Sequence, residues 1–169
     1  MIILVMGVSG SGKTTVGKLL ADSLHWEFSD ADAFHSLENV EKMRRGIPLT
    51  EADRMPWLQN LQTAIKQWLQ DNKDVVLACS ALKQSYRQFL TLDSDGFANA
   101  KGERIKIVYL KGAYELIQQR LQQRQNHYMS EKLLSSQFET LEEPLDTIYM
   151  DVAQTPQAIV QNIRMTLGI

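Results

Sequence analysis

The ten residues MGVSGSGKTT at positions 6–15 constrain the fold of this chain more than any other stretch. An apolar run at 2–5 precedes them, and the segment that follows, at 16–24, has apolar residues at helical spacing. This order predicts a strand, a glycine-rich turn and a helix. The pattern G-x-x-x-x-G-K-[ST] is met by Gly7, Gly12, Lys13 and Thr14. The sequence therefore predicts a site for the phosphates of a nucleotide.

The chemistry of this loop follows from its residue types. Glycines allow the backbone to turn tightly and to approach an anion, so that successive N–H groups and the helix dipole favour bound phosphate. Lys13 adds a mobile positive charge for the β- and γ-phosphates, and the Thr14 hydroxyl is suited to ligate Mg²⁺. A glycine-rich surface turn is the alternative, but the strand before the loop and the helix after it favour phosphate binding.

Length, charge and cysteine content limit the other possibilities. A chain of 169 residues is expected to form one domain, residues 1–169, with one substantial core. Its net charge of −2 comes from interspersed acidic and basic residues, which gives no support to a nucleic-acid or membrane partner. The single cysteine, Cys79, excludes an intramolecular disulfide and is expected to be a buried, inert thiol. No stretch resembles a signal peptide or a membrane span, so the expected compartment is the cytoplasm.

Two aspartates follow a second predicted strand at 26–29. Ligands of open α/β sheets bind beyond the carboxyl ends of the strands, and Asp30 and Asp32 would lie there. One carboxylate can orient the shell of a Mg²⁺ ion, while the other accepts a hydroxyl proton or holds a polyol. The alternative is a helix N-cap and a turn, for which aspartate is also suited. The nearby phosphate loop favours the functional interpretation.

Two helices are predicted in the next part of the chain. One spans 37–45, and the other begins with a capping box and runs over about 51–70. Arg54 stands in the first turn of the second helix, where the helix dipole favours anions rather than cations. It therefore either binds a ligand or forms a salt bridge with Glu51 or Asp53, and the spacing leaves both open.

The third predicted strand, at 74–79, is a compact apolar run typical of a buried parallel strand. It lacks the aspartate that helps to hold the metal at this place in many phosphate-loop proteins, so the aspartate pair is the expected source. A helix is predicted from about Leu82, which would put Lys83 and Arg87 one turn apart on one face. Two cations there suit an anionic substrate, and a solvated helix face is the alternative.

The rest of the chain continues the alternation of strands and helices. Strands are predicted at 104–110 and 147–152, helices at 113–124, at 130–141 and after a turn at 154–156, and a loop at 93–102. Arg120 and Arg124 lie four residues apart on a helix, and an anionic ligand would offset their repulsion. The whole pattern predicts the α/β class, with a five-stranded parallel sheet covered by helices on both faces in three layers.

Five segments together resemble the gluconate kinases (gluconokinases), small phosphate-loop kinases related to the shikimate, adenylate and other nucleoside monophosphate kinases. They are MGVSGSGKTT, DADAFH, NVEKMRRGIPLTEADRMPWL, CSALKQSYR and QFETLEEP, and the resemblance covers nearly the whole chain. The glycine loop is common to many NTPases, whereas the DADAFH, DRMPWL and CSALK blocks in this order are more specific. The resemblance implies transfer of a phosphoryl group from ATP to the 6-hydroxyl of D-gluconate with Mg²⁺. It also implies a homodimer.

The resemblance further implies a role for each matching residue. The nucleotide would be held by Gly7, Val8, Ser9, Gly10, Ser11, Gly12, Lys13, Thr14, Thr15, Arg120, Arg124 and Pro156, the metal by Thr14 and Asp30, and the acceptor by Asp32, His35, Arg54, Ser80, Lys83, Arg87 and Gln137. Lys13, Asp32 and Arg124 would be catalytic, with Asp32 accepting or orienting the attacking hydroxyl. A lid is expected at about 120–140 and an acceptor-binding helical region at about 35–70. Asn126 departs from the family, in which a glycine often precedes the lid histidine, here His127.

Two rival functions are compatible with the phosphate loop. Another small-molecule kinase of this fold would differ in its acceptor pocket, where a nucleobase favours aromatic stacking over charges such as those of Asp32 and Arg54. A nucleotide-binding switch would bind without turnover, and it has little need of a full set of transfer residues.

Overall fold

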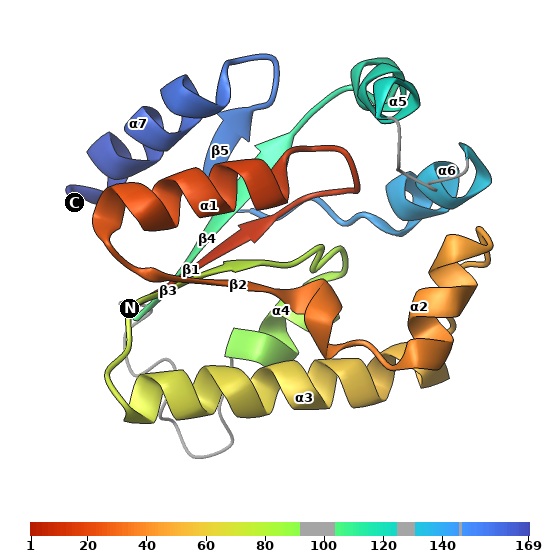
Figure 1. The fold of residues 1–169 in the computed structure, drawn as a ribbon, viewed down its shortest axis with the longest axis horizontal. Coiled ribbons are helices and arrows are strands. Elements are labelled where there is room, and N and C mark those ends of the chain that lie inside the picture. Colours follow the sequence, from red (N-terminus) through yellow and green to blue (C-terminus); the bar gives the residue numbers. More distant parts are fainter. Residues whose placement is uncertain (92–103, 125–130, 146) are drawn as a thin grey trace.

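A computed structural model describes residues 1–91, 104–124, 131–145 and 147–169. Five parallel strands form one sheet in the order β2-β3-β1-β4-β5 (Figure 1). Their bounds are β1 Ile2–Met6, β2 Glu27–Asp30, β3 Val75–Ala78, β4 Ile105–Lys111 and β5 Ile148–Asp151. The predicted α/β class and five-stranded parallel sheet are confirmed.

Helices cover both faces of this sheet. They are α1 Lys13–Leu24, α2 Leu37–Arg44, α3 Glu51–Gln70, α4 Gln84–Thr91, α5 Tyr114–Gln123, α6 Glu131–Thr140 and α7 Pro156–Leu167, with a 3₁₀ turn, η1, at Ala31–Phe34. Figure 1 shows α1 and α7 on one side of the sheet and α3 and α4 on the other, which gives the predicted three layers. Helices α2 and α6 lie beyond the carboxyl ends of the strands.

Strand β1 is buried along its whole length because helices pack on both of its faces. Ile2, Leu4 and Met6 belong to the core on the α3 side, whereas Ile3 and Val5 belong to the core on the side of α1 and α7. Successive side chains of a strand point to opposite faces, so a run that is apolar at every position is what a central parallel strand needs.

The register of the strands gathers distant segments at one edge of the sheet. Val5 of β1 pairs with Ala78 of β3, and Ala78 pairs in turn with Asp30 of β2. The three strands therefore end side by side. The phosphate loop follows β1, the aspartate pair follows β2 and Ser80 follows β3, so all three segments meet where ligands of α/β sheets bind.

Most element boundaries lie within two residues of the predicted ones. Helix α3 has the predicted bounds. Its start is fixed by a full capping box, in which Asp53 N–H donates to Thr50 Oγ1 over 3.1 Å and Thr50 N–H donates to Asp53 Oδ2 over 2.9 Å. The helix predicted from about Leu82 begins at Gln84 instead.

Part of the expected lid joins the phosphate loop through a small apolar cluster. Ile117 and Leu121 of α5 and Leu134 of α6 pack with Val8 and Leu82. The predicted loop at 93–102, and within the lid Asn126 and His127, lie outside the described residues. No helix of the described ranges is long and apolar enough to cross a membrane.

Candidate active site

The phosphate loop has the geometry that anion binding requires. Gly12, the residue before α1, has a φ of 98°, and no side chain of the described residues caps this end of the helix. The first N–H groups of α1 are therefore available to an anion. Gly10 also has a positive φ, and a Cβ atom there would come within 2.8 Å of Leu121. Ser11 Oγ is buried without a hydrogen-bond partner among the described residues, as expected for a loop shaped around a ligand.

Lys13 lies at the start of α1 and reaches back across the loop. Its Nζ donates to the Val8 carbonyl over 3.0 Å, which holds the ammonium group beside the glycine turn. Desolvation lowers the pKa of Lys13, while the carboxylates of Asp32 and Asp30 oppose that shift. The lysine thus lies near two aspartates, in the place where phosphates would bind.

Asp30 uses its two carboxylate oxygens for different purposes. Oδ1 accepts a hydrogen bond from Asp32 N–H over 2.9 Å and caps η1, while Oδ2 accepts one from the Thr14 hydroxyl over 3.1 Å. The sequence left an N-cap and a metal role as alternatives, and the geometry accommodates both. Two oxygens this close suit Mg²⁺, which prefers oxygen ligands. No cluster of three or more His, Cys, Asp or Glu side chains is found in the described ranges, so phosphates and water would supply the remaining ligands.

Asp32 opens onto the same cavity. Its side chain remains exposed, but partial desolvation by the cavity walls, together with the neighbouring Asp30 carboxylate, raises the pKa of Asp32, while Lys13 lowers it. A raised pKa makes a carboxylate a stronger base once it is ionised. Asp32 therefore has the electrostatic setting of a proton acceptor.

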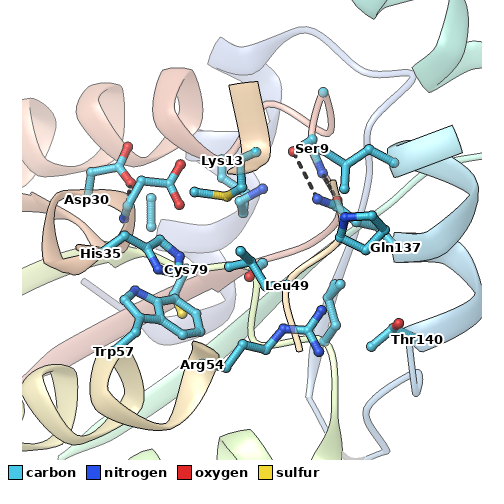
Figure 2. Close-up of a pocket in the computed structure, with 18 of the residues that line it drawn as sticks. Ser9, Lys13, Asp30, His35, Leu49, Arg54, Trp57, Cys79, Gln137 and Thr140 are labelled. Carbon is cyan, nitrogen blue, oxygen red and sulfur yellow. Dashed lines mark hydrogen bonds between the residues drawn. The ribbon is translucent and has the colours of Figure 1, made fainter. Parts of the chain in front are cut away.

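His35 is held on three sides. Its ring stacks on Trp57 with the ring centroids 4.4 Å apart and the planes 10° from parallel (Figure 2). Its backbone N–H donates to the Asp32 carbonyl over 3.2 Å, and Nδ1 lies 3.3 Å from Asn39 Nδ2. Desolvation and the Arg54 charge lower the pKa of His35 to about 4. The imidazole is therefore neutral at pH 7.

Arg54 lines the cavity and also forms contacts with its neighbours. Its Nη1 donates to the Tyr86 hydroxyl over 3.1 Å and lies 3.5 Å from Glu51 Oε1. Glu51 Oε1 accepts further hydrogen bonds from Tyr86 and from Lys83 Nζ, over 2.7 and 2.6 Å. The predicted salt bridge with Glu51 is therefore present, and Arg54 also lines the cavity, so that its binding of a ligand stays a prediction.

Two predicted cations do not line the cavity. Lys83 precedes α4 and is engaged by Glu51. Arg87 is only 6% exposed, and its guanidinium donates to the main-chain carbonyls of Ala81, Leu82 and Glu142 over 2.8, 3.1 and 2.8 Å. Because these donors are already satisfied, Arg87 ties the segment after β3 to the segment after α6. Arg87 does not line the cavity in this structure, and its predicted contact with an acceptor stays a prediction.

The predicted lid residues also divide into those that line the cavity and those that do not. Arg124 lines the cavity, whereas Arg120 Nη2 donates to the Val152 carbonyl over 2.6 Å and does not. Gln137 lines the cavity from α6, where its Oε1 accepts a hydrogen bond from Ser9 N–H over 2.8 Å (Figure 2). Pro156 stands in the first turn of α7, away from the cavity lining.

One cavity of about 390 Å³ joins the phosphate loop to the predicted acceptor residues. The predicted residues that line it are Ser9, Gly10, Gly12, Lys13, Thr14, Asp30, Asp32, His35, Arg54, Ser80, Arg124 and Gln137. Sequence reasoning missed Arg44, Trp57 and Tyr86, which also line it. Arg44 and Trp57 lie in the NVEKMRRGIPLTEADRMPWL segment and Tyr86 lies in CSALKQSYR, two of the segments that carry the family resemblance. A volume of this order suits a small ligand beside a nucleotide phosphate.

Comparisons with known proteins agree with this geometry. The shikimate kinase family model matches residues 9–167. A probable gluconokinase of Mus musculus is 48% identical over 152 residues, covering 85% of this chain and 83% of its own, and a gluconokinase of Arabidopsis thaliana is 41% identical over 169 residues, covering 96% and 89%. The crystal structure of a gluconokinase from Sinorhizobium meliloti superposes with a TM-score of 0.83 at 39% identity and covers 98% of this chain and 90% of its own. The chain therefore belongs to the shikimate kinase family of phosphate-loop kinases and, within it, to the gluconokinases.

Proposed function

We propose that this protein transfers the γ-phosphoryl group of ATP to the 6-hydroxyl of D-gluconate, giving 6-phosphogluconate and ADP. The proposal rests on one observation above all: the phosphate loop and a set of acceptor groups line the same cavity. Lys13 and Thr14 lie on the nucleotide side, and Asp32, His35 and Arg54 lie on the acceptor side. The names of the relatives support gluconate as the acceptor.

The acceptor side suits a hydroxylated acid. Arg54 presents paired N–H donors, which match a carboxylate. Asp32 accepts hydrogen bonds from hydroxyl groups, and Ser80 and the neutral His35 add further polar contacts at the same wall. The helical region at about 35–70 supplies two of these groups, and we assign acceptor binding to it.

The transfer itself needs one proton acceptor and several positioned cations. The Asp32 carboxylate takes the proton of the attacking hydroxyl, the oxygen forms a bond to the γ-phosphorus, and the bond from that phosphorus to the β-γ bridging oxygen breaks as ADP leaves. Lys13 and Arg124 neutralise charge on the transferring group. Thr14 and Asp30 would hold Mg²⁺, which supplies further neutralisation of the phosphates. Backbone N–H groups of the phosphate loop hold the triphosphate in place.

The remaining expectations stay proposals of the same kind. The segment at about 120–140 would act as a lid that keeps water from the phosphoryl group, with Gln137 at its contact with the phosphate loop. Arg120 would serve the adenine side, since it lies outside the cavity that Arg124 lines. A homodimer and a cytoplasmic location follow from the family resemblance and from the need for ATP.

ADP release by the purified protein tests the reaction. Mg-ATP would be supplied with D-gluconate, other aldonic acids, glycerate, shikimate and nucleoside monophosphates in parallel. Turnover with gluconate far above the others is the expected result. Turnover with a different acceptor would keep the kinase but reject the acceptor assignment, and ATP binding without turnover on any acceptor would favour a nucleotide-binding switch.

A further inference from the structure

The proton position on His35 decides what this residue can recognise. A neutral imidazole carries its proton on Nδ1 or on Nε2, and the other nitrogen can only accept a hydrogen bond. The contact between His35 Nδ1 and Asn39 Nδ2, at 3.3 Å, involves one of these nitrogens. Which tautomer is present therefore follows from the direction of that hydrogen bond.

Asn39 determines this direction because its amide has a fixed orientation. The side chain is 5% exposed, and its Nδ2 lies 2.8 Å from the Asp53 main-chain carbonyl. A carbonyl oxygen can only accept, so the amide nitrogen, and not the amide oxygen, must face it. The same nitrogen carries a second hydrogen, which points to His35 Nδ1. Asn39 is thus a donor to both neighbours, and Nδ1 of His35 is the acceptor.

The proton of the neutral ring must then lie on Nε2. This atom has no hydrogen-bond partner in the part of the chain that the structure describes. It is also not one of the buried side-chain atoms that lack a partner there, which are Ser11 Oγ and Thr147 Oγ1. Nε2 is therefore accessible, on a residue that lines the cavity. The stack on Trp57, whose Nε1 donates to the Ala31 carbonyl over 2.8 Å, holds the plane of the ring, and a half-turn within that plane would put the Cδ2–H group in place of Nδ1 against the Asn39 donor.

We propose that Asn39 is a positioning residue that fixes His35 as a neutral Nε2–H donor, and that this donor selects an acceptor substrate with an oxygen lone pair at that point. The ligand class is a polyhydroxy acid, and this part of the inference rests on the proposed function. Asp32 at the same wall only accepts hydrogen bonds when ionised, whereas His35 only donates into the cavity. A substrate must therefore offer a hydroxyl hydrogen to one and an oxygen lone pair to the other.

The tautomer is measured directly by two-bond ¹⁵N–¹H correlation spectra of the imidazoles at neutral pH, without ATP or acceptor. His35→Gln identifies the His35 signals, and His25, at the end of α1, serves as an internal reference. The expected spectrum is that of an Nε2–H ring. In Asn39→Asp the carboxylate would accept from Nδ1 and convert the ring to the Nδ1–H form or to imidazolium, whereas the matched change Asn162→Asp on α7 leaves it unaltered. A wild-type Nδ1–H ring, or an Asn39→Asp ring that stays Nε2–H, would overturn the proposal.

A kinetic comparison tests recognition without relying on Asn39. The amide nitrogen of glutamine can occupy the place of Nε2, whereas that of asparagine reaches only the place of Nδ1. We expect His35→Asn to raise the KM for gluconate about 3- to 10-fold above that of His35→Gln, at similar kcat, because one neutral hydrogen bond is lost. Equal KM values would overturn recognition by Nε2–H. Failure of the gluconate assignment itself would instead appear as absent turnover of the wild type, with the spectra unaffected.

Discussion

The two sides of the cavity are built in different ways. The phosphate side comes from one contiguous segment, in which β1, the glycine turn and α1 follow each other within 24 residues. The acceptor side is assembled from several elements: η1, α2 and α3, which follow one another in the sequence, and the segment after β3. We expect backbone N–H groups to do most of the binding on the first side, and side chains held by other side chains to do it on the second.

This difference predicts how each side responds to mutation. Phosphate binding should depend strongly on a few charged groups, because backbone conformation supplies the rest. Acceptor binding should depend on networks, since Arg54 is anchored by Glu51 and Tyr86 and His35 by Trp57 and Asn39. Substitutions of supporting residues should therefore change the KM for the acceptor and leave ATP binding alone.

The largest effect is expected from Lys13→Met. The variant loses a cation beside the transferring phosphoryl group, and kcat should fall about 10³-fold or more. Steady-state ADP release and a thermal melt measure activity and folding together. Lys18→Met on the exposed face of the same helix is the matched control and should keep full activity. An active Lys13→Met enzyme would contradict the assignment of the phosphate side.

Asp32→Asn should lower kcat by about 10² to 10⁴, because the amide cannot take the hydroxyl proton. ATP affinity, measured by calorimetry, should change little. The raised pKa also places the acidic limb of the wild-type kcat/KM profile above the ordinary aspartate value of about 3.9. Asp22→Asn on α1 controls for the change of charge. A change in acceptor KM alone would reduce Asp32 to a positioning group.

Arg54→Ala should raise the KM for gluconate about 10- to 100-fold, since a charge-assisted hydrogen bond to the carboxylate is lost. The KM for a neutral polyol analogue should change much less, and the ratio of the two KM values is the readout. Arg164→Ala, which removes an arginine far from the cavity, is the control. If the KM values for both acceptors rise equally, Arg54 supports the fold rather than binding the carboxylate.

Tyr86→Phe tests how Arg54 is anchored, and its expected effect is smaller. The hydroxyl accepts from Arg54 Nη1 and donates to Glu51, so its removal loosens the guanidinium without removing its charge. We expect the KM for gluconate to rise about 3- to 10-fold, with kcat retained. Tyr149→Phe at the far edge of the sheet serves as the control. An unchanged KM would mean that Glu51 alone anchors Arg54.

The smallest effect concerns stability and pH. The pKa of His35 is about 4 in the folded protein and near 6.5 when unfolded, so the unfolded state binds more protons between these values. The neutral His35 therefore contributes stability that is fully present above pH 6.5 and is lost as the pH falls towards 4. Denaturant unfolding at several pH values should show that the free energy of unfolding falls more steeply with decreasing pH for the wild type than for His35→Gln. Parallel curves would show that His35 titrates normally.

The sequence predicted the parts of the molecule that depend on local interactions. The phosphate loop and the bounds of α3 follow from short motifs, a glycine turn and a capping box, whose hydrogen bonds close within a few residues. The approximate order of strands and helices follows from apolar periodicity in the same way. Placement of Asp30 and Asp32 needed one further rule, the position of ligands at the carboxyl ends of parallel strands.

What could not be predicted depends on tertiary partners. Lys83 and Arg87 share a helical spacing, yet Lys83 lies before α4 and Arg87 is enclosed by carbonyl groups from the segments around Ala81 and Glu142. Nothing in the local sequence indicates that Glu142 comes near. The stack of His35 on Trp57 could not be predicted from the local sequence either, because it joins the residue after η1 to the second turn of α3.

The most direct test of the whole account is the ³¹P NMR spectrum, recorded with proton coupling, of the product formed from D-gluconate and Mg-ATP. Transfer to the 6-hydroxyl predicts one new phosphomonoester, whose phosphorus signal is split into a triplet by the two protons of the primary C6 carbon. A doublet, which indicates phosphorylation of a secondary hydroxyl, would contradict the way in which Asp32 and Arg54 orient the acceptor. Release of inorganic phosphate alone would contradict transfer to an acceptor in this cavity.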